Sequence, residues 1–316
     1  MIEINVDTIK ETVRKLCIEA CTELPLDVRK ALEDARGREN SDALTSGRSC
    51  SKTAVAVLDT IIENYRIAES DRVPICQDTG MTCVFAEIGQ DVHLTGGDFE
   101  EAVNQGVAEA YVGAFLRKSV VKDPIRRGNT GDNTPAMIYE TIVPGETVKL
   151  TVAPKGFGSE NMSAIRMLKP AAGLNGVRNF ILETVKKAGP NPCPPIVVGV
   201  GIGGTFDKCA NLAKKALLRP IGERNPDPYY ADLERELYEK INELNIGPQG
   251  FGGLTTALAV HIETLPTHIA GLPVAVNINC HVSRHKSAVI SGDASVRVET
   301  ADMTGERPVD GQTGQG

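Results

Sequence analysis

Three cysteines each follow a short apolar run at the point where a turn or loop begins. They are Cys76, Cys193 and Cys280, in the segments Ile-Cys-Gln-Asp-Thr-Gly, Asn-Pro-Cys-Pro-Pro and Ile-Asn-Cys-His. A structural zinc site usually has thiolates two to four residues apart, and none of these three has such a partner. Three thiolates can hold three corners of a [4Fe-4S] cluster and leave its fourth iron open as a Lewis acid. The pattern therefore favours one cluster that binds a substrate oxygen, which suits a hydratase better than an electron carrier.

The composition is that of a globular chain with an acidic balance. The 316 residues are 41% apolar, and 34 basic against 41 acidic residues give a formal net charge of −7. Without a basic block, nucleic acid is not expected as a partner. The sequence shows neither a secretory signal nor a bilayer-spanning apolar run, so we expect a cytoplasmic protein without membrane contact. Its eight cysteines are then expected to be reduced thiols.

Apolar periodicity predicts a helical N-terminal part that leads into a mixed-sheet α/β body. Residues 1–70 have helical spacing, with Cys17 and Cys21 on the buried stripe. From Val73 on, short β-rich runs broken by Gly and Pro alternate with helices. We expect one catalytic domain over residues 1–293. Residues 294–316 are expected to be a polar tail that is flexible or orders against a partner.

Individual elements can be placed within this body. The expected helices cover 99–116, 208–218 and 230–244, and the expected strands 82–88, 255–263 and 272–279. Two further apolar runs, 136–143 and 146–153, flank Pro144-Gly145, which is a hairpin signal.

Polar groups follow the first cysteine on a turn that ends in Gly80. Gln77, Asp78 and Thr79 offer an amide, a carboxylate and a hydroxyl at one place, although Asp78 could instead bond its own backbone in an Asx-turn. The Gly-rich loop 155–161 could cradle a carboxylate with its N–H groups, or could be a simple turn that needs positive φ. Arginines that could clamp a dicarboxylate through paired hydrogen bonds are Arg117, Arg126, Arg127 and Arg284.

The run Gly199-Val-Gly201-Ile-Gly203-Gly204 satisfies a dinucleotide-binding fingerprint between an apolar run and a helix. Glu223 lies where a ribose-binding acid would be sought, but the preceding helix leaves no room for the strand that should carry it. Dinucleotide binding is therefore the weaker interpretation.

Two histidines lie near the third cysteine in sequence. His268, in Leu-Pro-Thr-His, could carry a proton or act as an electrophile, or could be a hydrogen-bonded histidine at a strand edge. His281 adjoins Cys280 and could be mistaken for a zinc ligand, but its side chain should point away from that of its neighbour.

At these residues the sequence resembles the N-terminal catalytic domain of the oxygen-sensitive iron–sulfur class I fumarases, and the form in which that domain is a separate α-subunit. The resemblance runs to about residue 293. It is carried by Cys-Gln-Asp-Thr-Gly at 76–80, Asn-Thr-Gly at 129–131, Lys-Gly-x-Gly-Ser at 155–159, Cys-Pro-Pro at 193–195, Gly-Gly-Thr at 203–205, Leu-Pro-x-His at 265–268 and Cys-x-x-x-Arg at 280–284.

The resemblance implies a set of site residues. Cys76, Cys193 and Cys280 would ligate a [4Fe-4S] cluster. The substrate carboxylates would contact Gln77, Asp78, Arg117 and Gly158. Asp78 and His268 would be the catalytic groups in the pocket. The implied reaction is the reversible anti elimination of water from (S)-malate to fumarate, a step of the tricarboxylic acid cycle.

Single-chain members of that family carry a second domain, which supplies the base and further cations. This chain ends before such a domain, so the resemblance implies a separate β-subunit in an α2β2 assembly. The α-subunit of L(+)-tartrate dehydratase shares the three cysteines and the reaction type, and Ser159-Glu160-Asn161 favours the fumarase. Alternatives from other classes are a Rossmann-type NAD-dependent oxidoreductase and a non-catalytic scaffold with a structural metal.

Overall fold

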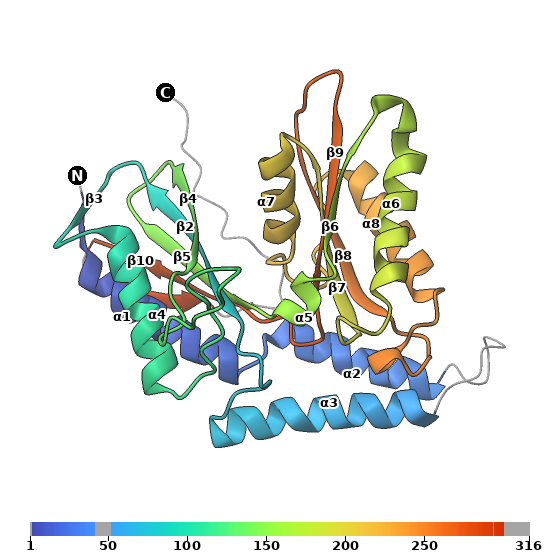
Figure 1. Ribbon diagram of the computed structural model, residues 1–316, viewed down its shortest axis with the longest axis horizontal. Helices are drawn as coiled ribbons and strands as arrows, with labels where there is room; N and C mark the ends of the chain where they lie inside the picture. The colour runs from blue at the N-terminus through green and yellow to red at the C-terminus, as the bar shows by residue number, and fades with distance from the viewer. Residues whose placement is uncertain (1, 42–51, 293, 300–316) are drawn as a thin grey trace, which may run out of the picture.

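A five-stranded sheet and a four-stranded sheet stand side by side above the helices α2 (Leu26–Ser41) and α3 (Lys52–Asp71) (Figure 1). The computed structural model describes residues 2–41, 52–292 and 294–299. Each of these sheets mixes parallel and antiparallel pairs. The predicted α/β class, with a helical N-terminal part and mixed sheets, is confirmed. None of the described helices combines the length and the apolar character needed to cross a membrane.

The five-stranded sheet has its third strand in sequence at the centre. Its order is β11 (Val296–Glu299), β10 (Lys286–Ile290), β5 (Val148–Lys155), β2 (Met81–Gly89) and β4 (Met137–Val143). A two-stranded parallel sheet of β1 (Ile2–Asn5) and β3 (Val92–Thr95) lies beside it.

The hairpin predicted around Pro144-Gly145 is wrong. β4 and β5 do not pair with each other, because β2 lies between them, parallel to β4 and antiparallel to β5. The C-terminal end of β2 contacts the loop that connects β4 to β5, where Gly89 N–H donates to Thr147 O over 2.9 Å. A Cβ atom at Gly89 would lie 2.4 Å from Gly145 O, so only glycine allows this approach.

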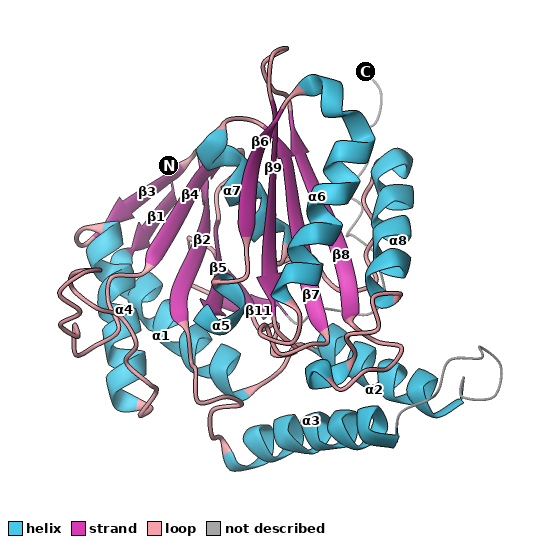
Figure 2. Ribbon diagram, turned by 45° about the vertical axis from the view of Figure 1, so that its right-hand side comes forward, coloured by secondary structure: helices cyan, strands magenta, loops and turns pink. Residues whose placement is uncertain are grey.

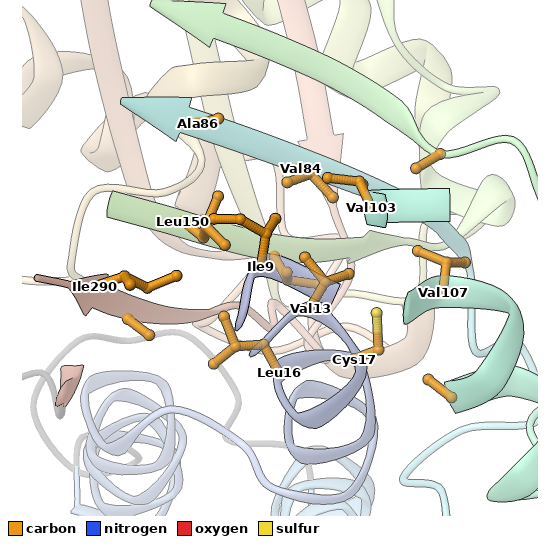
Figure 3. Close-up of a cluster of buried hydrophobic side chains, with 14 of the residues drawn as sticks. Ile9, Val13, Leu16, Cys17, Val84, Ala86, Val103, Val107, Leu150 and Ile290 are labelled. Atoms are coloured by element: carbon orange, nitrogen blue, oxygen red, sulfur yellow. The ribbon is translucent and has the colours of Figure 1, made fainter. Parts of the chain in front are cut away.

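Helices α1 (Val6–Thr22) and α4 (Phe99–Gly113) pack against the five-stranded sheet and form its core (Figure 3). The helical spacing of Ile9, Val13 and Leu16 turns all three side chains toward the sheet, where they are fully buried. Cys17 lies on the same face and is buried as predicted. Both helices begin at a capping side chain, since Asn5 accepts from Asp7 N–H and Asp98 accepts from Glu101 N–H, each over 2.8 Å.

The four-stranded sheet carries helices on both faces (Figure 2). Its order is β6 (Ala164–Leu168), β9 (Leu272–Asn279), β7 (Ile196–Gly203) and β8 (Ala257–Leu265). Helices α6 (Gly173–Ala188) and α8 (Pro228–Asn242) share an apolar core with one face. Helix α7 (Phe206–Ala216) packs on the other face through Cys209 and Ala213 against Ala275.

The glycine run that matches a dinucleotide fingerprint lies mostly inside β7 and serves helix packing. Cβ atoms at Gly199 and Gly201 would each lie 2.2 Å from a carbonyl oxygen of α7. The two glycines therefore let α7 approach the strand closely. This packing explains the pattern without a bound nucleotide.

Apolar side chains of α2 and α3 form a third cluster beneath both sheets, with Leu32, Leu58 and Ile62 among its members. Ile75 and Val282 contribute to this cluster, so the segment before β2 and the segment after β9 rest on the same base. The first cysteine-bearing loop follows Ile75 and the third precedes Val282. This base therefore positions two of the predicted ligands.

The predicted helices and strands occur with small shifts at their ends. The helix expected over 99–116 ends at Gly113, because Phe115 adopts a positive φ of 55° and cannot continue the helix. Within the segment 294–316, residues Val296–Glu299 form β11, which pairs with β10. The rest of that expected tail, 300–316, lies outside the described residues.

Candidate active site

Two of the three cysteines lie at the same end of the four-stranded sheet. Cys193 precedes β7 and Cys280 follows β9, and these strands are antiparallel with Val197 opposite Asn279. The backbone joins the two loops directly, because His281 N–H donates to Cys193 O over 3.3 Å. The Nδ1 atom of His281 lies 3.0 Å from the same oxygen, so its ring binds the Cys193 backbone.

Cys76 approaches this pair from the end of the helical base. Cys76 and Cys280 pack against the same apolar cluster. Burial raises the pKa of the Cys193 thiol, and the neighbouring Cys76 raises it further. The pKa of Cys280 is raised by burial, which outweighs the Arg284 guanidinium that lowers it, and Cys76 adds to the increase. The loops that carry the three predicted ligands therefore lie near one another.

Three thiols are the kind of donor that a [4Fe-4S] cluster uses. Within residues 2–41, 52–292 and 294–299, no three His, Cys, Asp or Glu side chains converge to hold one metal ion. The thiolates of a [4Fe-4S] cluster bind different irons, so they need not converge on one point. Cys193 is exposed and holds a φ of 55°, which is a strained conformation of the kind found at functional sites. Three thiols of this arrangement fit a cluster with one iron left open.

The turn after Cys76 is held from inside by side chains of several elements. The Asp78 carbonyl accepts from Arg284 Nη2, the Thr79 carbonyl from Tyr111 Oη over 2.8 Å, and the Gly80 carbonyl from Asn133 Nδ2 over 3.1 Å. These donors come from the segment after β9, from α4 and from the loop before β4. Three consecutive carbonyl groups are therefore fixed, which holds the turn in one conformation.

Asp78 joins the cysteine turn to the Gly-rich loop. Its Oδ1 atom accepts from Gly80 N–H, as in the predicted Asx-turn, and its Oδ2 atom accepts from Phe157 N–H, each over 3.0 Å. A Cβ atom at Gly156 would lie 3.4 Å from that Oδ2. Phe157 begins the short helix α5 (Phe157–Glu160), which lies between the five-stranded and the four-stranded sheet, near their lower ends in Figure 2. The Asx-turn interpretation of Asp78 is thus confirmed, and its second oxygen binds the Gly-rich loop.

A buried lysine pins the Gly-rich loop to β9. Lys155 Nζ donates to Ser159 Oγ over 2.9 Å and to Ile278 O over 2.8 Å. Burial lowers the pKa of Lys155 to about 8, against the opposing effect of the Glu160 carboxylate. Glu160 also binds Lys214 over 2.6 Å. Ser159 and Glu160, which favoured the fumarase in the sequence, therefore form part of an internal polar network.

The predicted substrate contacts surround this junction at the surface. Gln77, Arg117 and Gly158 are exposed. The Arg117 carbonyl accepts from Thr79 Oγ1 over 3.1 Å, which ties Arg117 to the cysteine turn. A side chain at Gly158 would meet no atom within 4 Å, so the Gly-rich loop faces open space here. Among the other arginines, Arg126 and Arg127 are exposed and Arg284 is buried.

His268 lies away from the cysteines. It belongs to the loop between β8 and β9, whereas Cys280 follows β9, and the eight residues of β9 span about 26 Å. Gly203 pairs with Leu265 at this far end, and Thr267 Oγ1 donates to Gly204 O over 2.9 Å. The motifs at 203–205 and 265–268 thus form a second group. One chain does not bring His268 to the cysteine loops.

Comparison with known proteins identifies the family of this chain. Residues 10–289 match the sequence model of the family described as Fumarate hydratase (Fumerase). A Methanocaldococcus jannaschii protein named putative L(+)-tartrate dehydratase subunit alpha is 45% identical over 293 residues, which cover 91% of this chain and 99% of that protein. The L(+)-tartrate dehydratase subunit alpha of Escherichia coli O157:H7 is 33% identical over 291 residues, 91% of this chain and 92% of its own. The chain therefore belongs to the Fumarate hydratase (Fumerase) family and is an enzyme of the hydro-lyase class.

Proposed function

We propose that this chain is the α-subunit of a two-subunit class I fumarate hydratase, which converts (S)-malate reversibly to fumarate. The observation that carries the proposal is the meeting of Cys76, Cys193 and Cys280 beside a Gly-rich loop that Asp78 holds in place. The family match over residues 10–289 supports the same reaction class. The enzyme would act in the cytoplasm, in the tricarboxylic acid cycle.

Cys76, Cys193 and Cys280 would hold a [4Fe-4S] cluster as three thiolates. When bound, such a cluster supplies an iron with an open coordination position that acts as a Lewis acid toward the substrate hydroxyl. An open iron of this kind also makes an enzyme sensitive to oxygen. The exposed position of Cys193 supports a cluster that faces the substrate.

The remaining site residues would bind and orient the dicarboxylate. The Arg117 guanidinium is exposed beside the cysteine turn and could bind one carboxylate through two hydrogen bonds. Gln77 could donate its amide N–H to the same group, and the open backbone at Gly158 lets a substrate approach the loop. Both oxygens of Asp78 already accept backbone N–H groups, so we assign Asp78 to orienting the site rather than to proton transfer.

A β-subunit would complete this site. It would supply the base that removes the C3 proton and further cations for the second carboxylate, in an α2β2 assembly. The relatives in Methanocaldococcus jannaschii and Escherichia coli are named alpha subunits, which supports a partner of this kind. A role for His268 in the same chemistry would require a second subunit to bring its loop to the cysteines, because β9 separates them within one chain.

Tartrate dehydration is the second candidate function. The names of the relatives favour it, and the reaction also removes water from a hydroxy-dicarboxylate. The sequence argument for fumarase from Ser159 and Glu160 is weakened, because both side chains contact Lys155 inside the protein. Substrate preference must then be set by groups that face the pocket.

The deciding experiment is an assay of the anaerobically purified αβ complex on (S)-malate and on L(+)-tartrate. We expect a higher kcat/KM for malate, followed as fumarate absorbance. A higher kcat/KM for tartrate, with oxaloacetate as product, would replace the first proposal by the second. Activity on neither substrate in a complex that carries iron and sulfide would contradict both. The α-subunit alone is expected to carry the cluster and to turn over poorly.

A further inference from the structure

Arg284 is a buried cation without a carboxylate partner. Its side chain lies in the protein interior with the residue 4% exposed. Within the part of the chain that the structure describes, no acidic side chain forms an ion pair with it. Arg219, a mostly buried arginine in the segment after α7, is by contrast paired with both Glu234 and Glu263. Arg284 therefore differs from the usual case, in which a buried charge is paired.

The hydrogen bonds of Arg284 leave one nitrogen unused. Its Nη2 donates to the Asp78 carbonyl, and its Nε donates to Pro154 O over 3.4 Å. Its Nη1 is buried and has no hydrogen-bond partner among the described residues. A buried guanidinium N–H without an acceptor costs free energy, so its persistence points to an acceptor that the chain alone lacks.

Several thiols and the Tyr111 phenol also lie near this guanidinium. Burial lowers the pKa of Arg284, but nearby Cys21, Cys280 and Cys76 raise it more, so the guanidinium remains charged. Cys21 is itself buried and lies 3.7 Å from Thr79 O, with burial raising its pKa, and so stays a neutral thiol. Arg284 lies four residues after Cys280 and binds the carbonyl two residues after Cys76, so the ligand thiolates Cys76 and Cys280 are the anions available to it.

We propose that Arg284 is the built-in counter-charge of the cluster, an inference that rests on the function proposed above. Its guanidinium would balance the negative charge of the thiolate-bound cluster, and its free Nη1 would donate a hydrogen bond there. Its Nη2 meanwhile fixes the carbonyl two residues after Cys76. Arg284 is thus a positioning residue. It is not the dicarboxylate clamp that the sequence allowed, because its side chain does not reach the surface.

A counter-charge has a measurable consequence for the cluster. The reduction potential of an iron–sulfur cluster depends on nearby charge and on hydrogen bonds to sulfur. Loss of a buried positive charge disfavours the added electron, so the potential of Arg284→Gln should shift to more negative values. Arg284→Lys keeps the charge and should keep the potential close to that of the wild type. If Arg284 only maintained the shape of the turn, the reduction potential would not depend on whether the substituting residue is charged.

The test is a potentiometric titration of the cluster in the anaerobic αβ complex, followed by electron paramagnetic resonance. The variants are Arg284→Gln, Arg284→Lys and the control Arg219→Gln, which removes a buried arginine paired with carboxylates. We expect a negative shift in Arg284→Gln alone. Cluster loss in Arg284→Gln but not in Arg284→Lys would also support the proposal.

Several results would overturn it. An unchanged potential in a cluster-loaded Arg284→Gln complex would exclude the counter-charge, and a fall in kcat/KM without that shift would indicate a substrate clamp. Equal loss of the cluster in both variants would show that shape rather than charge matters. If Arg284→Gln does not fold, the lysine variant decides, since a shifted potential there contradicts the proposal and an unshifted one supports it. A wild-type complex without iron and sulfide would instead remove the proposed function and this inference together.

Discussion

The Asp78 carboxylate and the Phe157 backbone join two loops that lie 79 residues apart in the chain, through a hydrogen bond of 3.0 Å. One loop carries the first ligand cysteine and the other carries the glycines that face open space. A single carboxylate thus fixes the distance between the proposed cluster and the proposed carboxylate-binding loop. Activity should depend on this link more strongly than folding does.

Asp78→Ala should lower kcat by roughly 10²-fold, because misplacing a preorganised loop costs about as much as losing one oriented donor. The iron and sulfide content should stay at the wild-type level, since the three thiols remain. The matched control is Asp232→Ala, which removes an exposed carboxylate paired with Arg235. Steady-state kinetics of the αβ complex provide the measurement. Equal kcat values for the two variants would contradict the positioning role of Asp78.

Arg117→Ala should raise KM for the dicarboxylate substrate by about tenfold or more, since a charge-assisted contact contributes roughly 1.5–3 kcal/mol. Thermal stability should not change, because the Arg117 side chain is exposed and its contact with Thr79 uses the backbone carbonyl. The control is Arg166→Ala, whose guanidinium pairs with Glu183 on the surface. An unchanged KM in Arg117→Ala would remove this residue from the substrate site.

Much of this candidate site is predictable because informative residues adjoin the proposed ligand cysteines in the sequence. The turn that begins at Cys76 ends in Gly80, which indeed adopts a positive φ of 80°. The helices are predictable because α1 and α8 have clear apolar stripes and capping residues such as Asn5 and Asp227. The expected pairing of 136–143 with 146–153 fails because strand neighbours depend on long-range packing, here the insertion of β2.

Other site features have no local signal in the sequence. Tyr111 and Asn133 hold the carbonyls of Thr79 and Gly80, but each reaches that turn only after the chain has folded. The burial of Lys155 within the Gly-rich loop likewise depends on β9, which supplies Ile278 O. The far position of His268 follows from the strand directions, because β8 runs parallel to β7 and β9 runs antiparallel to it, which the His268 motif does not reveal.

Gly201→Ala tests whether the glycine run serves packing. The new Cβ atom would lie 2.2 Å from Cys209 O and 2.7 Å from Ala213 N, both backbone atoms of α7 that cannot move alone. We expect a loss of about 2–3 kcal/mol in the free energy of unfolding in urea. Gly37→Ala is the control, because its Cβ would meet no atom within 4 Å in α2, and it should stabilise by about 0.5–1 kcal/mol. Saturating NAD should leave the melting temperature unchanged, and a clear rise would revive the dinucleotide interpretation.

His261 should make the protein sensitive to acid. Burial, helped by the nearby Arg219, lowers the pKa of His261 in the folded protein to about 3, against 6.5 for a free histidine. The unfolded chain therefore binds more protons between these values, and stability falls as the pH drops below 6.5. From about pH 7.5 to about pH 5 this residue should cost about 2 kcal/mol of unfolding free energy.

The check is urea unfolding of the wild type and of His261→Gln over that pH range. Glutamine can still donate to Ala216 O, which lies 3.2 Å from His261 Nδ1. As the pH falls, the free energy of unfolding of the wild type should decrease relative to that of His261→Gln. Parallel pH profiles would show that His261 does not titrate with unfolding.

The most direct test of the account is iron and acid-labile sulfide analysis of the anaerobically purified αβ complex, with Cys193→Ser and Cys209→Ser beside the wild type. Cys209 is buried and its thiol donates to Gly201 O over 3.2 Å, a bond that a serine hydroxyl can replace. We expect about four irons and about four sulfides per α-subunit in the wild type and in Cys209→Ser, and loss of both metal and activity in Cys193→Ser. Equal metal content in the two serine variants, or a single metal ion with four protein ligands, would contradict the cluster held by Cys76, Cys193 and Cys280.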